Sequence, residues 1–197
     1  MRVVTAPNDC AAYGVISVFL AGGISECWNW QEAVINKLKE MEENGFDMRS
    51  LVLFNPRRLS FDVNNPGDTK AQINWESYWL GCCDIFSMYF CNSESVQPIC
   101  MYELGRNLLK KSNDWEDDDT RFCHSVLISI EKGYKRTDDV LIQTELATSG
   151  LIRPFVYEDP NEAIAELAAR IYISYVQLKA YYGPEVIKEW EAKDEQM

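Results

Sequence analysis

The sequence predicts an α/β fold in which a parallel sheet carries helices on both faces. Five short runs with the apolar and aromatic content of buried strands are spread along the chain. Stretches with helical spacing of apolar residues separate these runs, and the chain shows no repeat and no low-complexity segment. Strands that alternate with helices pair in parallel, because each helix returns the chain to the same edge of the sheet.

The first strand is expected at 15–20, and small residues follow it at Ala21, Gly22 and Gly23. A loop of small residues lets a ligand approach the backbone and leaves amide donors facing it. The loop matches neither GxGxxG nor GxxxxGK(S/T), so the sequence does not predict a dinucleotide fold or a P-loop. We therefore expect these residues to contact a small ligand through their backbone.

The next stretch, 28–43, has helical spacing of its apolar residues, and Ser25 is expected to cap its amino end. Trp28 at its start has two interpretations. It is a packing or rim residue, or it forms a wall on which an aromatic ligand stacks. The spacing alone does not decide between them.

A second strand, 51–54, leads into a long polar loop at 55–68. Loops of this length in a compact protein are usually functional or mobile. Arg57 and Arg58 stand near its start, and paired loop arginines are most often solvated charges. On so acidic a chain, however, they are the obvious place to hold a phosphate.

Two carboxylates flank the expected third strand, 84–90. Glu76 lies before it in a predicted helix at 69–82. After it, Pro98 opens another helix, because its fixed φ suits a first turn, and Glu103 then faces the carboxyl end of the strand. Apolar neighbours surround Glu103, so it is a candidate nucleophile or acid with a raised pKa, or else a surface charge. Glu76 matters to function only if its helix ends beside Glu103.

The remaining strands are expected at 123–130 and 152–157, with helices at 137–148 and 160–182. The last is a long C-terminal helix, and Thr137 is expected to cap the helix before it. Five strands of this kind favour a flavodoxin-like, doubly wound sheet with the order 2-1-3-4-5. That order places a ligand crevice between the first and third strands.

The composition excludes several classes of protein. The 197 residues suffice for one domain, 1–197, with its own core. Acidic residues outnumber basic ones 31 to 19, and the net charge of -12 argues against nucleic acid or an anionic membrane as a partner. No apolar run approaches a membrane span and no signal-type block opens the chain, so we expect a cytoplasmic protein.

Metal and disulfide chemistry are not predicted either. The seven cysteines form no CxxC pair, which favours reduced thiols in or near the core. His124 is the only histidine, so a His-based triad or a multi-His metal site has little to be built from. The acidic tract 114–119 lacks a spaced ligand pattern and is interpreted as a solvated loop.

Several of these segments together resemble the nucleoside 2-deoxyribosyltransferase-like proteins. The resemblance implies a flavodoxin-like fold and homodimers or larger assemblies in which a neighbour completes the site. It also implies cleavage of the N-glycosidic bond of nucleosides or nucleoside 5'-monophosphates, without a metal or organic cofactor. The motifs are VFLAGGIS at 18–25, LFNPRR at 53–58, NWE at 74–76, CDIFSMYF at 83–90, QPICMYELG at 97–105 and GYKRTDDVLIQ at 133–143.

The same resemblance implies roles for individual residues. The Glu of the ELG motif falls on Glu103, which would attack the anomeric carbon and pass the sugar to water or another base with net retention. The family's carboxylate eight residues before the strand-opening Asp84 falls on Glu76, which would protonate the leaving base. The residues from Ala21 to Gly23 would cradle sugar and base, and Asp84 is expected to be structural.

Two positions depart from the pattern of the transferases. Those proteins end the first strand with a Tyr whose hydroxyl holds the nucleophile, whereas this chain has Phe19, so Glu103 needs another partner. Six residues before the nucleophile they place an Asp for the 5'-hydroxyl, and related nucleotide hydrolases place a phosphate-binding Ser. Gln97 stands here, and its neutral amide favours a monophosphate because it does not repel phosphate. The expected phosphate donors are Arg57, Arg58 and, from a neighbouring subunit, Arg136.

Two other classes of function remain open on the sequence. A non-catalytic nucleotide-binding or sensing module would keep the crevice without turnover; Phe19 favours it, and the presence of Glu103 and Glu76 argues against it. A purely structural domain would require both carboxylates and the arginine pair to be coincidental. The sequence therefore favours an enzyme that acts on an N-glycosidic bond.

Overall fold

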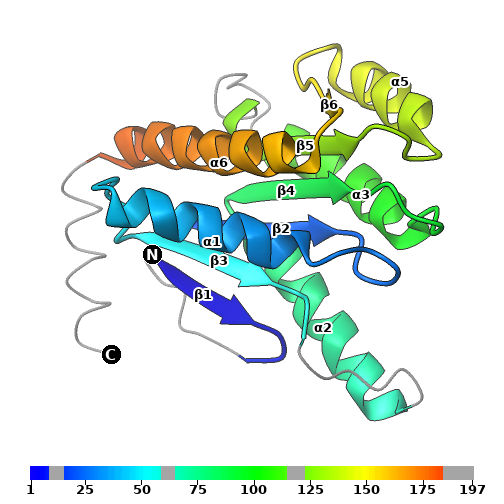
Figure 1. Ribbon diagram of the computed structural model, residues 1–197, viewed down its shortest axis with the longest axis horizontal. Helices are drawn as coiled ribbons and strands as arrows, with labels where there is room; N and C mark the ends of the chain where they lie inside the picture. Colours follow the sequence, from blue (N-terminus) through cyan, green and yellow to red (C-terminus); the bar gives the residue numbers. More distant parts are fainter. Residues whose placement is uncertain (9–15, 59–64, 115–122, 184–197) are drawn as a thin grey trace.

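The computed structural model describes residues 1–8, 16–58, 65–114 and 123–183. Six strands form one parallel sheet in the order β1-β3-β2-β4-β5-β6 (Figure 1), which confirms the predicted parallel α/β architecture. The strands are β1 (Arg2–Thr5), β2 (Ile16–Gly22), β3 (Leu51–Asn55), β4 (Ile85–Phe90), β5 (Val126–Glu131) and β6 (Phe155–Tyr157).

The predicted number and order of strands are wrong, because a sixth strand extends the sheet at its edge. β1 pairs with β3, and Val3 lies opposite Leu53. β1 covers only four residues and is mostly half-buried, so its sequence carries little strand signal. The five predicted strands are arranged as β3-β2-β4-β5-β6, and the winding of the sheet changes direction between β2 and β4.

Helices cover both faces of the sheet. They are α1 (Trp30–Glu43), α2 (Pro66–Cys82), α3 (Pro98–Asp114), α5 (Thr137–Thr148) and α6 (Pro160–Tyr182). α1 and α6 pack on one face, and α2, α3 and α5 pack on the other (Figure 1). None of the helices in the described ranges is long and apolar enough to cross a membrane.

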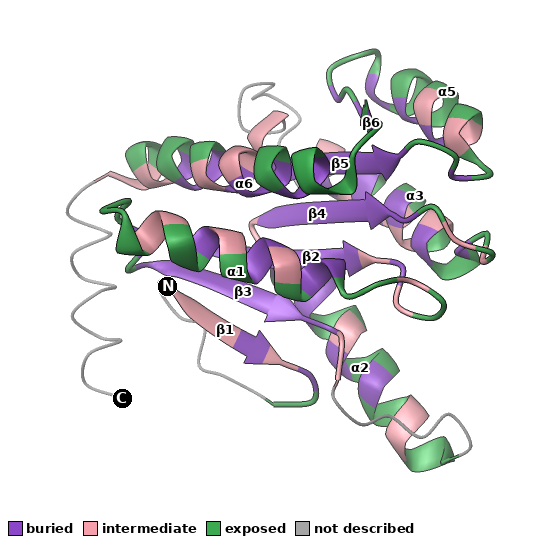
Figure 2. Cartoon of the chain, viewed as in Figure 1, coloured by how far each residue is buried: buried purple, intermediate pink, exposed green. Residues whose placement is uncertain are grey.

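The central strands are buried on both sides (Figure 2), which explains their continuous apolar runs. Successive residues of β2 alternate between the two layers. Val18 and Leu20 pack with α1 and α6, whereas Phe19 and Ala21 pack with α2 and α3. Phe19 and Ala21 therefore face the layer that also carries the two candidate carboxylates.

Two predicted helix caps are wrong. Asn29, and not Ser25, caps α1, because its side chain accepts a hydrogen bond from the backbone N–H of Glu32. The Thr137 hydroxyl does not cap α5; it donates to the backbone carbonyl of Tyr134 at 2.7 Å. Residue type alone predicts Ser25 and Thr137 as caps. The local backbone geometry decides which side chain reaches the first turn of each helix.

Some boundaries also differ from those predicted. Residues 123–125 form a helical turn ahead of β5, and β6 begins only at Phe155, so both strands are shorter than expected. α2 begins earlier than expected, at Pro66, because Asn65 caps it and proline suits a first turn. Residues 115–119 of the predicted acidic loop lie outside the described residues.

Asp84 has the structural role that the sequence predicts. Its Oδ2 atom accepts hydrogen bonds from the backbone N–H and the hydroxyl of Ser17, both at 2.8 Å. Its Oδ1 atom accepts from the Tyr182 hydroxyl at 3.1 Å. These bonds tie the amino end of β4 to β2 and α6, at the edge opposite the strands' carboxyl ends.

Candidate active site

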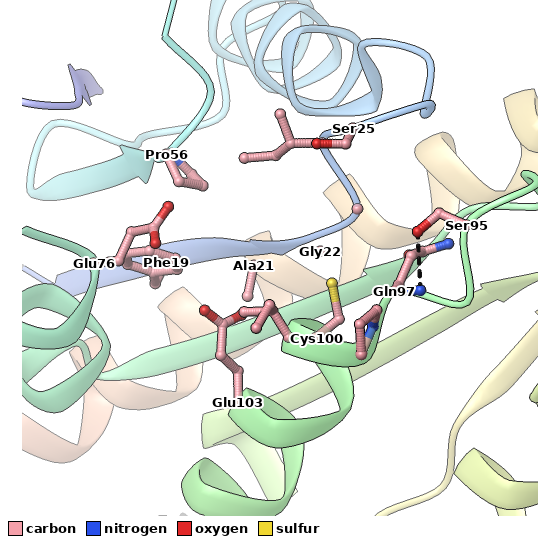
Figure 3. A pocket seen from close by; sticks show the side chains of 14 residues that line it. Phe19, Ala21, Gly22, Ser25, Pro56, Glu76, Ser95, Gln97, Cys100 and Glu103 are labelled. Atoms are coloured by element: carbon pink, nitrogen blue, oxygen red, sulfur yellow. Dashed lines mark hydrogen bonds between the residues drawn. The ribbon is translucent and has the colours of Figure 1, made fainter. Parts of the chain in front are cut away.

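A pocket of about 220 Å³ lies at the carboxyl ends of β2 and β4, where the winding of the sheet changes direction (Figure 3). One wall is the end of β2 with the segment that follows it. Another is the first turns of α3 with the segment that precedes it, and α2 contributes one side chain. Open parallel sheets bind their ligands at this position.

The structure brings together seven of the residues predicted for the site. Both carboxylates and the small residues after the first strand are among them, so the pocket unites segments far apart in the sequence. The predicted arginines and Trp28 do not line the pocket. The seven residues are Phe19, Ala21, Gly22, Gly23, Glu76, Gln97 and Glu103.

Glu103 stands on the second turn of α3, and Leu104 beside it anchors this turn in the core. Burial of the carboxyl, followed by the negative charge of Glu76, raises the pKa of Glu103 to about 7, and the charge of Arg106 opposes this shift. Near neutral pH, Glu103 is therefore present in both its ionised and its protonated form. An ionised fraction is what a nucleophile requires.

Glu76 reaches the same pocket from α2, where Trp75 and Trp79 anchor the helix in the core. Gln72, one turn earlier, donates from Nε2 to Glu76 Oε1 at 2.7 Å and to the Pro56 carbonyl at 2.8 Å. Burial raises the pKa of Glu76, and the hydrogen bond from Gln72 partly offsets this. Because Oε1 accepts that bond, a proton on this carboxyl would reside on Oε2.

The two carboxyls act on each other. Figure 3 shows them on the same side of the pocket, beside Phe19 and Ala21. Two nearby, partly buried carboxyls do not both ionise readily, so the pair retains a proton near neutral pH. A carboxylate beside a carboxylic acid is the arrangement that divides the nucleophile and acid roles in glycoside cleavage.

No hydroxyl takes the place of the tyrosine that the resemblance implies. Phe19 is 1% exposed, and its ring centroid lies 5.9 Å from that of Trp75. Within the described ranges, no group donates a hydrogen bond to the Glu103 carboxylate, and Asn107 bonds only the backbone carbonyl of that residue. Phe19 therefore packs against α2 and offers no hydrogen bond to orient the carboxyl pair.

Gln97 lies in the pocket wall with its amide group held against the protein. Its Nε2 donates to the Cys91 carbonyl at 2.7 Å, and its Oε1 is buried without a partner in the described part of the chain. The residue is 4% exposed and has a φ of 49°, in the left-handed region that is uncommon for residues with a side chain. A buried acceptor that lacks a partner costs about 1–3 kcal/mol.

Gly22 and Gly23 allow the ends of β2 and β4 to approach closely. A Cβ on Gly22, whose φ is 147°, would meet the Tyr89 carbonyl oxygen at 2.3 Å. A Cβ on Gly23 would meet the Cys27 sulfur at 2.4 Å and Gln97 Oε1 at 2.6 Å. The Gly23 N–H donates to the Tyr89 carbonyl at 3.3 Å, so close packing, more than amide donation to a ligand, explains these glycines.

Arg57 holds the segment that follows β2. Its guanidinium donates to Gln31 Oε1 at 2.9 Å and to the backbone carbonyls of residues 23, 24, 27 and 28 at 3.0–3.3 Å. An arginine engaged in this way has its donors directed at the backbone. The predicted role in phosphate binding therefore has no support in its contacts.

The other predicted binding residues also point elsewhere. Trp28 is 41% exposed, and its indole N–H donates to the Glu131 carboxylate at 2.6 Å. Arg136 pairs with Asp139 at 2.9 Å on the exposed surface of α5. Arg58 is half-buried and does not line the pocket.

Sequence reasoning missed half of the lining. Ser95 lies in the segment between β4 and α3. Topology alone predicts that this segment contacts a ligand, because it follows the carboxyl end of a central strand. Gln72, which orients Glu76, carries no such signal, because its role depends on helical packing. The missed lining residues are Ile24, Ser25, Pro56, Ser95, Pro98, Ile99 and Cys100.

The raised pKa of Glu103 predicts that stability falls with rising pH. The carboxyl has an ordinary pKa of 4.5 in the unfolded chain and about 7 in the folded protein, so the folded protein binds its proton more tightly. Between these two values the folded state holds more protons, and its stability therefore decreases as the pH rises. The decrease is complete only well above pH 7, where Glu103 is ionised in both states.

The variant Glu103→Gln, whose amide does not ionise, should lack this decrease. We expect its free energy of unfolding to exceed that of the wild type by about 1–3 kcal/mol at pH 8, and the difference to vanish near pH 4.5. Urea unfolding of both proteins at pH 5 and pH 8 measures it. A difference that is the same at both pH values would contradict the shifted pKa.

A buried carboxyl pair in a pocket at the switch point of a parallel sheet defines an α/β protein with an enzyme-like, small-molecule site. Residues 15–131, more than half of the chain, match the family described as nucleoside 2-deoxyribosyltransferase like. The protein belongs to this family, and the matched region includes both carboxyls. Membership supports an enzymatic function and a small-molecule nucleoside as the ligand. No curated protein matches the chain.

Proposed function

We propose that the protein cleaves or transfers at the N-glycosidic bond of a nucleoside through a glycosyl ester on Glu103. The observation that carries this proposal is the pair of partly buried carboxyls, Glu76 and Glu103, in one pocket. Burial raises the pKa of both carboxyls, and the proposed roles require that the proton lie on Glu76 and the negative charge on Glu103 when the substrate is bound. Family membership supports the same chemistry.

In the first step, a Glu103 carboxylate oxygen forms a bond to the anomeric carbon while the bond from that carbon to the base breaks. The electron pair leaves with the base nitrogen, which takes the proton from Glu76. In the second step, water or another base attacks the anomeric carbon and the ester bond breaks, which restores the Glu103 carboxylate. The proton of the attacking group returns to Glu76. Two inversions give net retention at the anomeric carbon.

The pocket favours an uncharged nucleoside over its 5'-monophosphate. None of its lining residues in the described ranges is Lys or Arg, and two of them are carboxyls. Gln97, which the sequence alone associates with phosphate, donates from its amide Nε2 to the Cys91 carbonyl, and its amide oxygen is buried. A phosphate charge roughly 8 Å from a carboxylate costs about 2 kcal/mol at an effective dielectric constant of about 20, or roughly 30-fold in affinity.

Base release from matched nucleosides and 5'-monophosphates tests both parts of this proposal. Purine and pyrimidine substrates, with ribose and with deoxyribose, are incubated with the protein, and free base is measured by chromatography. We expect release from at least one nucleoside, with kcat/KM at least tenfold above that of its monophosphate. A preference for the monophosphate would contradict the substrate class. The variant Arg136→Ala would then show whether a partner's arginine supplies the phosphate donor.

A non-catalytic nucleoside-binding module is the second candidate. It is favoured by the observation that no described group donates a hydrogen bond to the Glu103 carboxylate. Such a module would bind a nucleoside in calorimetry and release no base from any substrate. The same panel therefore separates the two functions.

We also propose a homodimer that buries the exposed face of α2 and α3. The two helices adjoin, since Arg106 donates to the Ser77 carbonyl at 3.1 Å. Ile99 is exposed on this face and also lines the pocket, so a second copy seated here would complete the pocket rim. Sedimentation velocity at low and high concentration tests the proposal, and a monomer at both would contradict it. The exposed apolar residues are Ile73, Tyr78, Ile99, Tyr102 and Leu109.

A further inference from the structure

Glu131 is a buried carboxylate that lies outside the pocket lining and has no part in the proposed reaction. It ends β5 and is 5% exposed. Its Oε1 accepts hydrogen bonds from the indole N–H of Trp28 at 2.6 Å and from the Tyr89 hydroxyl at 2.8 Å. Its Oε2 accepts from the backbone N–H of Asn92 at 2.8 Å. A buried charge is retained in a protein when donors surround it in this way.

The donors belong to both walls of the pocket. Trp28 lies in the segment 23–29, which contributes Gly23, Ile24 and Ser25 to the lining. Asn92 lies in the segment 91–97, which contributes Ser95 and Gln97. One carboxylate therefore joins the two segments that form the pocket walls.

The segment 23–29 is held from two further directions. The Trp30 indole N–H donates to the Gly23 carbonyl at 2.9 Å, and its ring stacks on Tyr89 at 4.8 Å. Arg57 donates to the carbonyls of the same segment. The segment thus lies between a buried carboxylate, which accepts a hydrogen bond from the Trp28 indole N–H, and the Arg57 guanidinium, which donates to the backbone carbonyls.

We infer that Glu131 is a positioning residue, which fixes the distance between the two walls of the pocket by holding Trp28 and Asn92 at once. The inference rests on the proposed function for the identity of the ligand. It also assigns Trp28 a role: its indole N–H is the link through which the segment 23–29 is fixed, and its ring is not a ligand wall.

Two variants break the two links separately. Glu131→Gln keeps the size of the side chain, but its amide N–H₂ opposes the Asn92 N–H, because two donors cannot bond. Trp28→Phe removes the indole donor and leaves the bond to Asn92. Glu158→Gln is the matched control, since Glu158 is an exposed carboxylate whose partner is Lys132. Thermal unfolding confirms that each variant is folded.

Hydrogen exchange measured by mass spectrometry tests the link itself, whatever the ligand is. We expect Glu131→Gln to reduce protection at least tenfold in 91–97, where Asn92 loses its acceptor, and Trp28→Phe to do so in 23–29. The control should change neither. Unchanged exchange in 91–97 of the Glu131→Gln protein would overturn the inference. If that protein fails to fold, unchanged exchange in 23–29 of the Trp28→Phe protein would overturn it.

Calorimetry then tests the consequence for the site. Nucleoside binding is measured in a Glu103→Ala background, which cannot turn over the substrate. We expect Glu131→Gln and Trp28→Phe to weaken binding at least tenfold relative to the Glu158→Gln control, because small displacements of a binding wall have effects of this size. Equal binding in all variants would overturn the positioning role. If the Glu103→Ala protein binds no nucleoside at all, the proposed function fails, and the exchange measurement still decides the link.

Discussion

Replacing Glu103 with glutamine is expected to reduce kcat by roughly 10⁴-fold or more, because the glycosyl ester cannot form without a carboxylate. Glutamine keeps the size of the side chain and resembles the protonated acid, so the fold should be retained. Alanine at the same position should have the same effect on turnover. Initial rates of base release, measured on the best nucleoside of the panel, give the ratio.

Glu145→Gln is the matched control for this variant, since Glu145 is an exposed carboxylate on α5. It should retain the activity of the wild type. If Glu103→Gln retained activity within tenfold of that control, Glu103 would not be the nucleophile. A Glu103→Gln protein that is inactive and also unfolded in circular dichroism would call for Glu103→Ala in its place.

Replacing Glu76 with glutamine is expected to slow turnover by about 10²- to 10⁴-fold, because a general acid acts chiefly in the transition state. The loss should be smallest for bases that leave readily without protonation. KM should change little, since Glu76 is not proposed to hold the ground state. Rates for a series of bases with different basicity measure this dependence.

A loss that is the same for every leaving group would assign Glu76 a positioning role. Gln72→Ala offers a comparison, because it removes the hydrogen bond to Glu76 Oε1 and keeps the carboxyl. The loss of turnover in Gln72→Ala should also be smallest for bases that leave readily, and it should be smaller than the loss in Glu76→Gln. The comparison separates the presence of the acid from its orientation.

The sequence predicts the parts of the site that depend on topology. Pro98 fixes the start of α3, helical spacing then places Glu103 on the second turn, and the parallel order brings that turn to the end of β2. These relations are set by backbone geometry, which residue type and spacing determine well. Glu76, by contrast, is assigned only by the family resemblance, through its position eight residues before Asp84.

The sequence does not predict where long polar side chains are directed. Arg57 and Gln97 are both suited to phosphate by residue type, but Arg57 donates to backbone carbonyls and Gln97 binds the Cys91 carbonyl with its amide N–H₂. Glu131 could not be recognised, because its three donors come from segments that only the folded chain brings together. The edge strand β1 is not predicted, because four residues, three of them half-buried, carry no clear period.

The most direct test of the account is to trap the sugar on Glu103. The variant Glu76→Gln is mixed with a nucleoside whose base leaves readily, so that the first step proceeds and the second is slow. The reaction is then stopped with acid, the protein is digested, and its peptides are weighed by mass spectrometry. We predict that the peptide containing Glu103 gains the mass of one sugar unit, and that no such gain occurs when Glu103→Gln is also present. Base release without any sugar on that peptide, or with the sugar on another residue, would contradict the account.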